Sequence, residues 1–218
     1  DPFNVVTFNL LQLLDTLDGF ETIRTDAVWV RLDRAEAPIL KEYVVSLAEE
    51  ALSELSDRYN FTPQGPILIE VFPKHDDFAV RNLGLPGMIG ALGACFGRVV
   101  TMDSPRARRP GTFSWQSTLW HELAHVITLQ MSNQRVPRWL TEGISVYEEG
   151  RAPPEWGRNQ ELAFAHALNE DQVLKLQDLN AGFTSPDTIS LAYYEASLLV
   201  EHLVASHGEQ ALHTMLRA

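Results

Sequence analysis

Two histidines and a glutamate interrupt an otherwise apolar stretch of the sequence. They are His121, Glu122 and His125 in the segment STLWHELAHVITLQ. An α-helix turns by about 100° per residue, so His121 and His125 lie one turn apart on the same face, with Glu122 beside them. Two imidazoles at this spacing can bind one metal ion, and the carboxylate is close enough to exchange protons. The alternative is a pair of core histidines bound to backbone groups.

A third metal ligand is expected farther along the chain, because a catalytic zinc ion takes three protein ligands and keeps one position for water. The segment RVPRWLTEGISVYEEG is typical of a second helix with Glu142 in its early part. The SNQR loop lets this helix fold back on the first, and Gly143 permits close packing against it. Glu148 and Glu149 are alternative ligands, but they lie about 9 to 10 Å farther along the helix axis. We interpret them as a solvated face, and the alternative is that they hydrogen-bond to a metal ligand.

The composition limits the classes of partner. The chain has 218 residues, with 29 acidic and 17 basic side chains and a net charge of -12, which opposes binding to nucleic acid. The single cysteine, Cys95, excludes an internal disulfide and a thiolate zinc site. No apolar stretch reaches the roughly 18 to 20 residues of a membrane span, and the amino end does not resemble a signal peptide.

Apolar periodicity predicts the elements that position the motif. Strand-like alternation runs through Val28, Val30 and Leu32, and a helical apolar stripe extends from Ile39 through Tyr43 to Leu55. Helices are expected at about 3–18, 36–58, 75–83, 114–131, 139–150, 158–169, 188–206 and 209–217, and strands within 20–33 and at 67–72 and 99–102.

The order of these elements predicts an α+β fold, with strands and helices first and helices alone afterwards. We expect one catalytic domain over residues 1–218. Its sheet-bearing half covers about 1–131 and includes the motif helix, and its helical half covers about 132–218. The metal site is expected between the two halves.

The metal motif resembles that of a known group of enzymes. HELAH followed by WLTEGISVYEE is similar to the core of the gluzincin peptidases, particularly the aminopeptidase N type. Over roughly residues 20–217 the chain also resembles the peptidase MA-like domains of bacterial proteins that carry tetratricopeptide repeats. The resemblance implies a zincin-like fold, zinc ligands His121, His125 and Glu142, and Glu122 as general base. Metal chemistry independently favours the same roles, since zinc activates water and a nearby carboxylate can take its proton.

The resemblance further implies a side chain that stabilises the oxyanion of the reaction. The segment AYYEAS offers Tyr193 and Tyr194, which lie about 100° apart on one helix, so only one of them can face the metal. A Y-x-x-S pattern shared with the related domains favours Tyr194, with Ser197 one turn on. The alternative is a tyrosine packed in the core with its hydroxyl hydrogen-bonded.

Two departures from relatives bear on the substrate. Aminopeptidases of this type carry a glutamate in a glycine-rich edge strand, and the matching stretch GALGA at 90–94 has none. Thermolysin-like enzymes have an aspartate where this chain has Val146. We therefore expect an endopeptidase acting on peptides or proteins, with an extended substrate lying along the edge strand. The alternatives are a non-catalytic zinc-binding scaffold or partner-binding module within a larger repeat protein, and a hydrolase of non-peptide amides.

Residues outside the motif receive simpler interpretations. The SPRARRPG loop, with Arg106, Arg108 and Arg109, is expected to be solvated. Relatives with tetratricopeptide repeats are often exported, so we expect such repeats beside this domain in the full-length protein and an extracytoplasmic location. The remaining histidines are expected at the surface or at helix ends: His75, His166, His202, His207 and His213.

Overall fold

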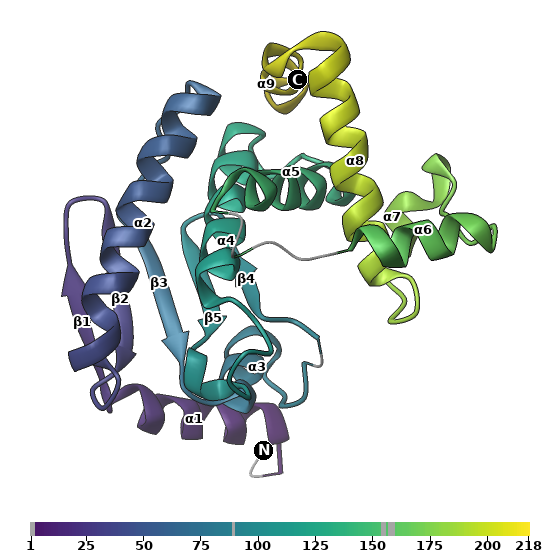
Figure 1. The fold of residues 1–218 in the computed structure, drawn as a ribbon. Coiled ribbons are helices and arrows are strands. Elements are labelled where there is room, and N and C mark those ends of the chain that lie inside the picture. Colours follow the sequence, from purple (N-terminus) through teal and green to yellow (C-terminus); the bar gives the residue numbers. More distant parts are fainter. Residues whose placement is uncertain (1–2, 89, 154–155, 157–159) are drawn as a thin grey trace. The chain divides into compact units, whose positions relative to one another are not determined.

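The chain forms two compact units, residues 1–126 and 127–218, shown in Figure 1. The computed structural model describes residues 3–88, 90–153, 156 and 160–218. Within these ranges the first unit contains the sheet, and the second contains helices and no strand. The predicted α+β order, a sheet-bearing half followed by a helical half, is therefore confirmed. The expectation of one catalytic domain stays a prediction.

A five-stranded sheet lies at the centre of the first unit, in the order β1-β2-β3-β5-β4. The three central strands run parallel to one another, and the two edge strands are antiparallel to their neighbours. The predicted strand region 20–33 is two strands, because the chain reverses at Thr25, whose backbone N–H donates to Val28 O at 2.9 Å. The strands are β1 (Phe20–Arg24), β2 (Val28–Asp33), β3 (Ile67–Phe72), β4 (Gly93–Cys95) and β5 (Val99–Asp103).

The predicted helices of the first unit are present as α1 (Val5–Leu17), α2 (Ala37–Tyr59) and α3 (His75–Leu83), and α2 lies against β2 (Figure 1). The predicted apolar stripe of α2 is wrong at Ile39 and Tyr43, which are 70% and 65% exposed. At 100° per residue both point away from the buried seam, which runs through Val44, Ala51 and Leu55.

A cluster of buried aromatic side chains positions the segment that leads into β4. Phe20, Phe72 and Phe78 pack together with Leu13 and Val80. Burying one such ring stabilises the fold by about 1.5–3 kcal/mol. The half-buried side chains Met88, Ala91 and Ala94 pack on this cluster. The start of the edge strand β4 is therefore packed against the hydrophobic core.

The second unit is built around two packed helices, α5 (Arg138–Arg151) and α8 (Ile189–His207). A Cβ added at Gly143 would lie 2.6 Å from Ala196 O, so glycine permits the close approach of α5 to α8. The sequence interpretation assigned this approach to the motif helix instead. Within the described ranges no helix is long and apolar enough to cross a membrane. The remaining helices are α6 (Glu161–Asn169), α7 (Leu179–Gly182) and α9 (Glu209–Arg217).

Candidate metal site

The predicted motif helix is α4 (Trp115–Met131), and it carries His121, Glu122 and His125 in its interior. Its first turn is capped by Ser114, whose Oγ accepts a hydrogen bond from Ser117 N at 3.1 Å. All three motif side chains are buried. Titratable groups at such positions need polar or metal partners, because burial without them is costly.

The three candidate ligands lie close together. The Nε2 atoms of His121 and His125 are 3.1 Å apart, and the candidate ligand atoms of these histidines and of the buried Glu142 all lie within 4.8 Å of one another. Zinc–nitrogen bonds of about 2.0–2.1 Å in a tetrahedral site separate two ligand nitrogens by about 3.3 Å. The spacing of the histidine pair therefore fits zinc. Glu142 offers a carboxylate oxygen as a third donor close to this pair.

Two contacts in the first turns of α5 position Glu142. One residue before it, Thr141 Oγ1 lies 2.7 Å from Thr128 Oγ1, and this hydrogen bond joins the last turns of α4 to the first turns of α5. Arg138 Nε donates to Glu142 Oε1 at 3.5 Å, one helical turn away. This ion pair is half exposed and contributes at most about 1 kcal/mol, so its effect is mainly on orientation.

A comparison with family models covers the segment that carries these helices. The model described as Peptidase MA superfamily matches residues 106–218, which include α4, α5 and α8. The chain belongs to the peptidase MA superfamily. A search of curated proteins found no match to it. The superfamily match and the His–His–Glu group together are consistent with a possible metallopeptidase.

The edge strand β4, which precedes the residues matched by the family model, lies directly against Glu122. A Cβ added at Gly93 would lie 2.5 Å from Glu122 Oε1 and 2.7 Å from its Cγ, so a side chain at this position would force the Glu122 carboxylate to move. Among the described strands β4 pairs only with β5, which leaves its other edge unpaired. Burial and the Glu122 carboxylate raise the pKa of the Cys95 thiol, which is therefore neutral. The sequence interpretation missed this contact, although the glycine-rich GALGA stretch was a signal for close backbone approach.

The two candidate tyrosines lie in different surroundings. The ring of Tyr193 meets Phe183 edge to face at 5.1 Å, and that of Tyr194 meets Phe164 at 5.4 Å. Burial, with the charges of nearby carboxylates, raises the pKa of Tyr194, so its hydroxyl stays protonated at neutral pH. The assignment of either residue to catalysis stays a prediction. Tyr194 lines a pocket of about 310 Å³ together with Tyr147, Glu149, Ser197 and Glu201.

Two carboxylates of α5 that were expected in solvent are buried. Glu148 and Glu149 are 0% and 4% exposed. The interpretation as a solvated face was wrong because the buried residues of α5 surround its whole circumference, as its packing along α8 requires. Buried carboxylates are held by paired or hydrogen-bonded groups. These two glutamates therefore belong to the interior of the second unit.

Other predictions for polar residues are confirmed in part. His166, His202 and His207 are exposed, and His75 is the first residue of α3. The prediction was wrong for His213, which is buried in the amphipathic helix α9. Arg106 and Arg109 are exposed as expected for a solvated loop, whereas Arg108 turns inward and is half-buried. Arg108 forms an ion pair with Asp103, the last residue of β5.

Proposed function

We propose that this domain is a zinc-dependent peptidase of the gluzincin type. The observation that carries the proposal is the convergence of His121, His125 and Glu142 beside a buried Glu122. Two neutral imidazoles and one carboxylate suit zinc and leave a coordination position for water. His121, His125 and Glu142 would hold the zinc ion, which would act as a Lewis acid and lower the pKa of a bound water towards about 7.

Glu122 is the proposed general base. Its position next to His121 in the sequence places its carboxylate beside the proposed ligands but on a different face of α4. It accepts a proton from the attacking water and delivers it to the leaving amine. A scaffold that only binds metal has no use for this carboxylate, so its presence favours an enzyme.

The proposed substrate is an extended peptide that adds to the free edge of β4. Backbone hydrogen bonds along an unpaired strand edge can hold a peptide without reading its sequence. Gly93 would bring the substrate backbone next to Glu122, because no side chain intervenes at that position. The stretch 90–94 carries no carboxylate to pair with a free amino terminus. We therefore propose that the enzyme cleaves bonds within peptide chains and does not remove single residues from the amino terminus.

Tyr194 is the proposed donor to the oxyanion, with Tyr193 as the alternative. The raised pKa of Tyr194 supports this role, since a donor must keep its proton at neutral pH. Comparing the kcat of Tyr194→Phe with that of Tyr193→Phe shows which of the two tyrosines has this role. Loss of about 100-fold in kcat is expected for Tyr194→Phe alone. Equal activity of both variants with wild type would exclude both tyrosines.

The test begins with metal content and then measures hydrolysis. We expect about one zinc ion per chain, lost in His121→Ala and Glu142→Ala and retained in His166→Ala, a matched control on the exposed face of α6. Glu122→Gln should keep zinc and lose at least about 100-fold in hydrolysis of an unfolded protein. A metal-free wild type would refute the zinc site. Zinc binding without cleavage of a broad peptide library would favour the scaffold alternative.

A further inference from the structure

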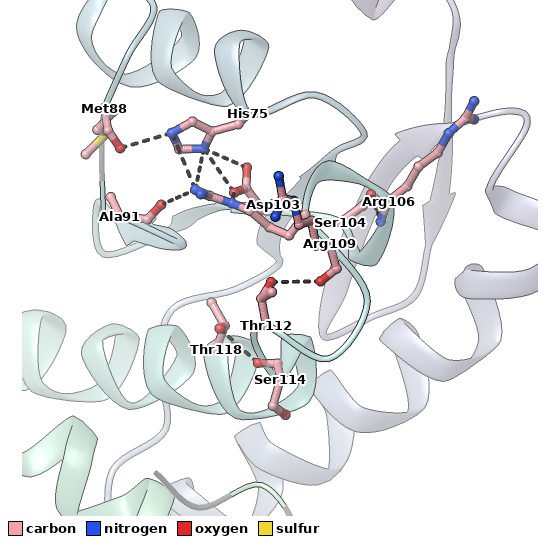
Figure 2. Close-up of polar contacts among 11 residues, drawn as sticks. His75, Met88, Ala91, Asp103, Ser104, Arg106, Arg109, Thr112, Ser114 and Thr118 are labelled. Atoms are coloured by element: carbon pink, nitrogen blue, oxygen red, sulfur yellow. Dashed lines mark hydrogen bonds and ion pairs between the residues drawn. The ribbon is translucent and has the colours of Figure 1, made fainter. Parts of the chain in front are cut away.

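A charged cluster lies at the end of β5, and Figure 2 shows its contacts. Asp103, the last residue of this strand, is fully buried. Its Oδ2 atom lies 2.9 Å from Nδ1 of His75 and 2.6 Å from Nε of Arg108. Both basic side chains are mostly shielded from solvent. A buried carboxylate with two such partners is firmly held, because burying it without them would be costly.

The same cluster binds the backbone of the segment that precedes β4. His75 Nε2 lies 3.0 Å from Met88 O, and Arg108 Nη2 donates to Ala91 O at 3.0 Å (Figure 2). The backbone N–H of Asp103 donates to Leu92 O at 2.9 Å. The backbone carbonyls of Met88, Ala91 and Leu92 are therefore tied to the end of β5 and the start of α3.

The ring of His75 can hold Met88 in either charge state. A carbonyl oxygen only accepts, so Nε2 must carry a proton to bind Met88 O. The other nitrogen, Nδ1, donates to Asp103 when the ring is protonated. In the neutral ring it can accept from Arg108 Nη2, which lies 2.7 Å away. The bond to the backbone does not depend on which state is populated.

The backbone near Met88 and Ala91 needs polar anchors because the neighbouring glycines are sparsely packed. Gly87 and Gly90 have φ angles of +91° and +89°, and a Cβ added at either would meet no described atom within 4 Å. A chain with this freedom loses more entropy on ordering than one with side chains. The segment runs directly into Gly93, the residue that lies against Glu122.

We propose that His75, Asp103 and Arg108 are positioning residues of the peptidase site. They fix the backbone at Met88, Ala91 and Leu92, and through it they hold β4 beside Glu122 and keep its free edge in place for the substrate. This inference rests on the proposed function, since it assigns β4 to substrate binding. None of the three residues touches the reacting atoms in this arrangement. Their effect on the reaction is transmitted through the backbone of β4.

Hydrogen exchange of the backbone amides tests the positioning role without any assay of activity. Two variants remove a hydrogen-bond donor: Arg108→Ala, and His75→Phe, which keeps an aromatic ring. Each should speed amide exchange in peptides from 84–95 about tenfold, as expected for loss of one charge-assisted hydrogen bond. His75→Gln can still donate to Met88 O and should stay near the wild-type rate. Arg98→Ala is the matched control, because Arg98 Nη2 binds the carbonyl of Gly65 at 2.9 Å instead.

Kinetics on an extended peptide provide the second measurement. In Arg108→Ala and His75→Phe we expect KM to rise about tenfold, with kcat changed less than about twofold and zinc content unchanged, because the substrate strand is displaced and the metal ligands are not. His75→Gln should restore KM. If Arg108→Ala does not fold, Arg108→Lys replaces it, since lysine keeps the charge beside Asp103 and loses the planar fork.

The outcomes separate this inference from the proposed function. Unchanged exchange in 84–95 in both donor-removing variants would overturn the positioning role, whether or not the protein is a peptidase. Faster exchange with unchanged KM and kcat would overturn it too, because the cluster would then serve the fold alone. A wild type that lacks zinc and hydrolyses nothing would refute the peptidase and, with it, a positioning role for that reaction. The exchange rates would still report whether the cluster holds the segment.

Discussion

Replacing Gly93 by alanine tests whether β4 packs against the side chain of Glu122. The added Cβ would lie 2.5 Å from Oε1, 2.7 Å from Cγ and 2.8 Å from Cδ of Glu122. Ordinary contacts between such atoms are about 3.5–4.0 Å, so each distance is too short by roughly 1 Å. Overpacking of this kind costs about 1–3 kcal/mol. The lower entropy of the unfolded alanine chain offsets about 0.4–1 kcal/mol, which leaves a net loss of about 1–2 kcal/mol.

A double-mutant cycle in urea measures this clash separately from other effects. Glu122→Ala removes Cγ, Cδ and Oε1, the atoms that the new methyl group would strike. In that background Gly93→Ala should therefore show only the entropic gain of about 0.4–1 kcal/mol, which gives a coupling free energy of about 1–3 kcal/mol. Gly150→Ala is the control, since a Cβ there meets no described atom within 4 Å, and it should show no coupling to Glu122.

The same substitution should lower activity without removing the metal. A displacement of Glu122 by about 1 Å misplaces the proposed general base and can reduce kcat/KM about 100-fold. Zinc content should be unchanged, because Glu122 is not among the proposed ligands. An equal cost of Gly93→Ala in the wild-type and Glu122→Ala backgrounds would show that the contact does not exist. Full hydrolytic activity of Gly93→Ala would show that it does not matter for the reaction.

Two further substitutions probe other parts of the fold. Gly143→Ala would place a Cβ 2.6 Å from the backbone oxygen of Ala196. We therefore expect the free energy of unfolding in urea to fall by about 3 kcal/mol, and zinc binding to weaken through the adjacent Glu142. Wild-type stability of this variant would contradict the close approach of α5 to α8. Burial raises the pKa of Glu36 above its usual 4.5, which Ser104 only partly offsets by hydrogen bonding. Because the folded protein binds this proton more tightly, the raised pKa stabilises it below pH 4.5, and this stabilisation is lost as pH rises through the raised pKa. As pH rises from 4.5 through the raised pKa, Glu36→Gln should therefore gain stability relative to wild type in urea unfolding, and a constant difference would contradict the raised pKa.

Elements whose signal is local could be predicted from the sequence. The buried alternation of β2 and the limits of α3 follow from side-chain periodicity, which depends only on neighbouring residues. The common face of His121 and His125 follows from the same helical geometry. The reversal at Thr25 was missed because a hairpin turn without glycine or proline gives a weak local signal.

What packs against each element could not be predicted in the same way. The contact of Gly93 with Glu122 joins an edge strand to a helix that begins some twenty residues later, and its existence depends on the register of β4 with β5. The burial of Glu148 depends on α8, which lies about forty residues farther along the chain. Such distant segments meet only when the core forms.

The sequence by itself therefore determined the chemistry available to this protein: two imidazoles one turn apart, a carboxylate beside them and a further glutamate on the next helix. These follow from residue type and helical pitch. The tertiary structure decided which side chains surround that chemistry. It placed the backbone of Gly93 against Glu122 and tied the preceding segment to Asp103. The physical reason is that contact and burial depend on which segments pack together, and no local pattern encodes that choice.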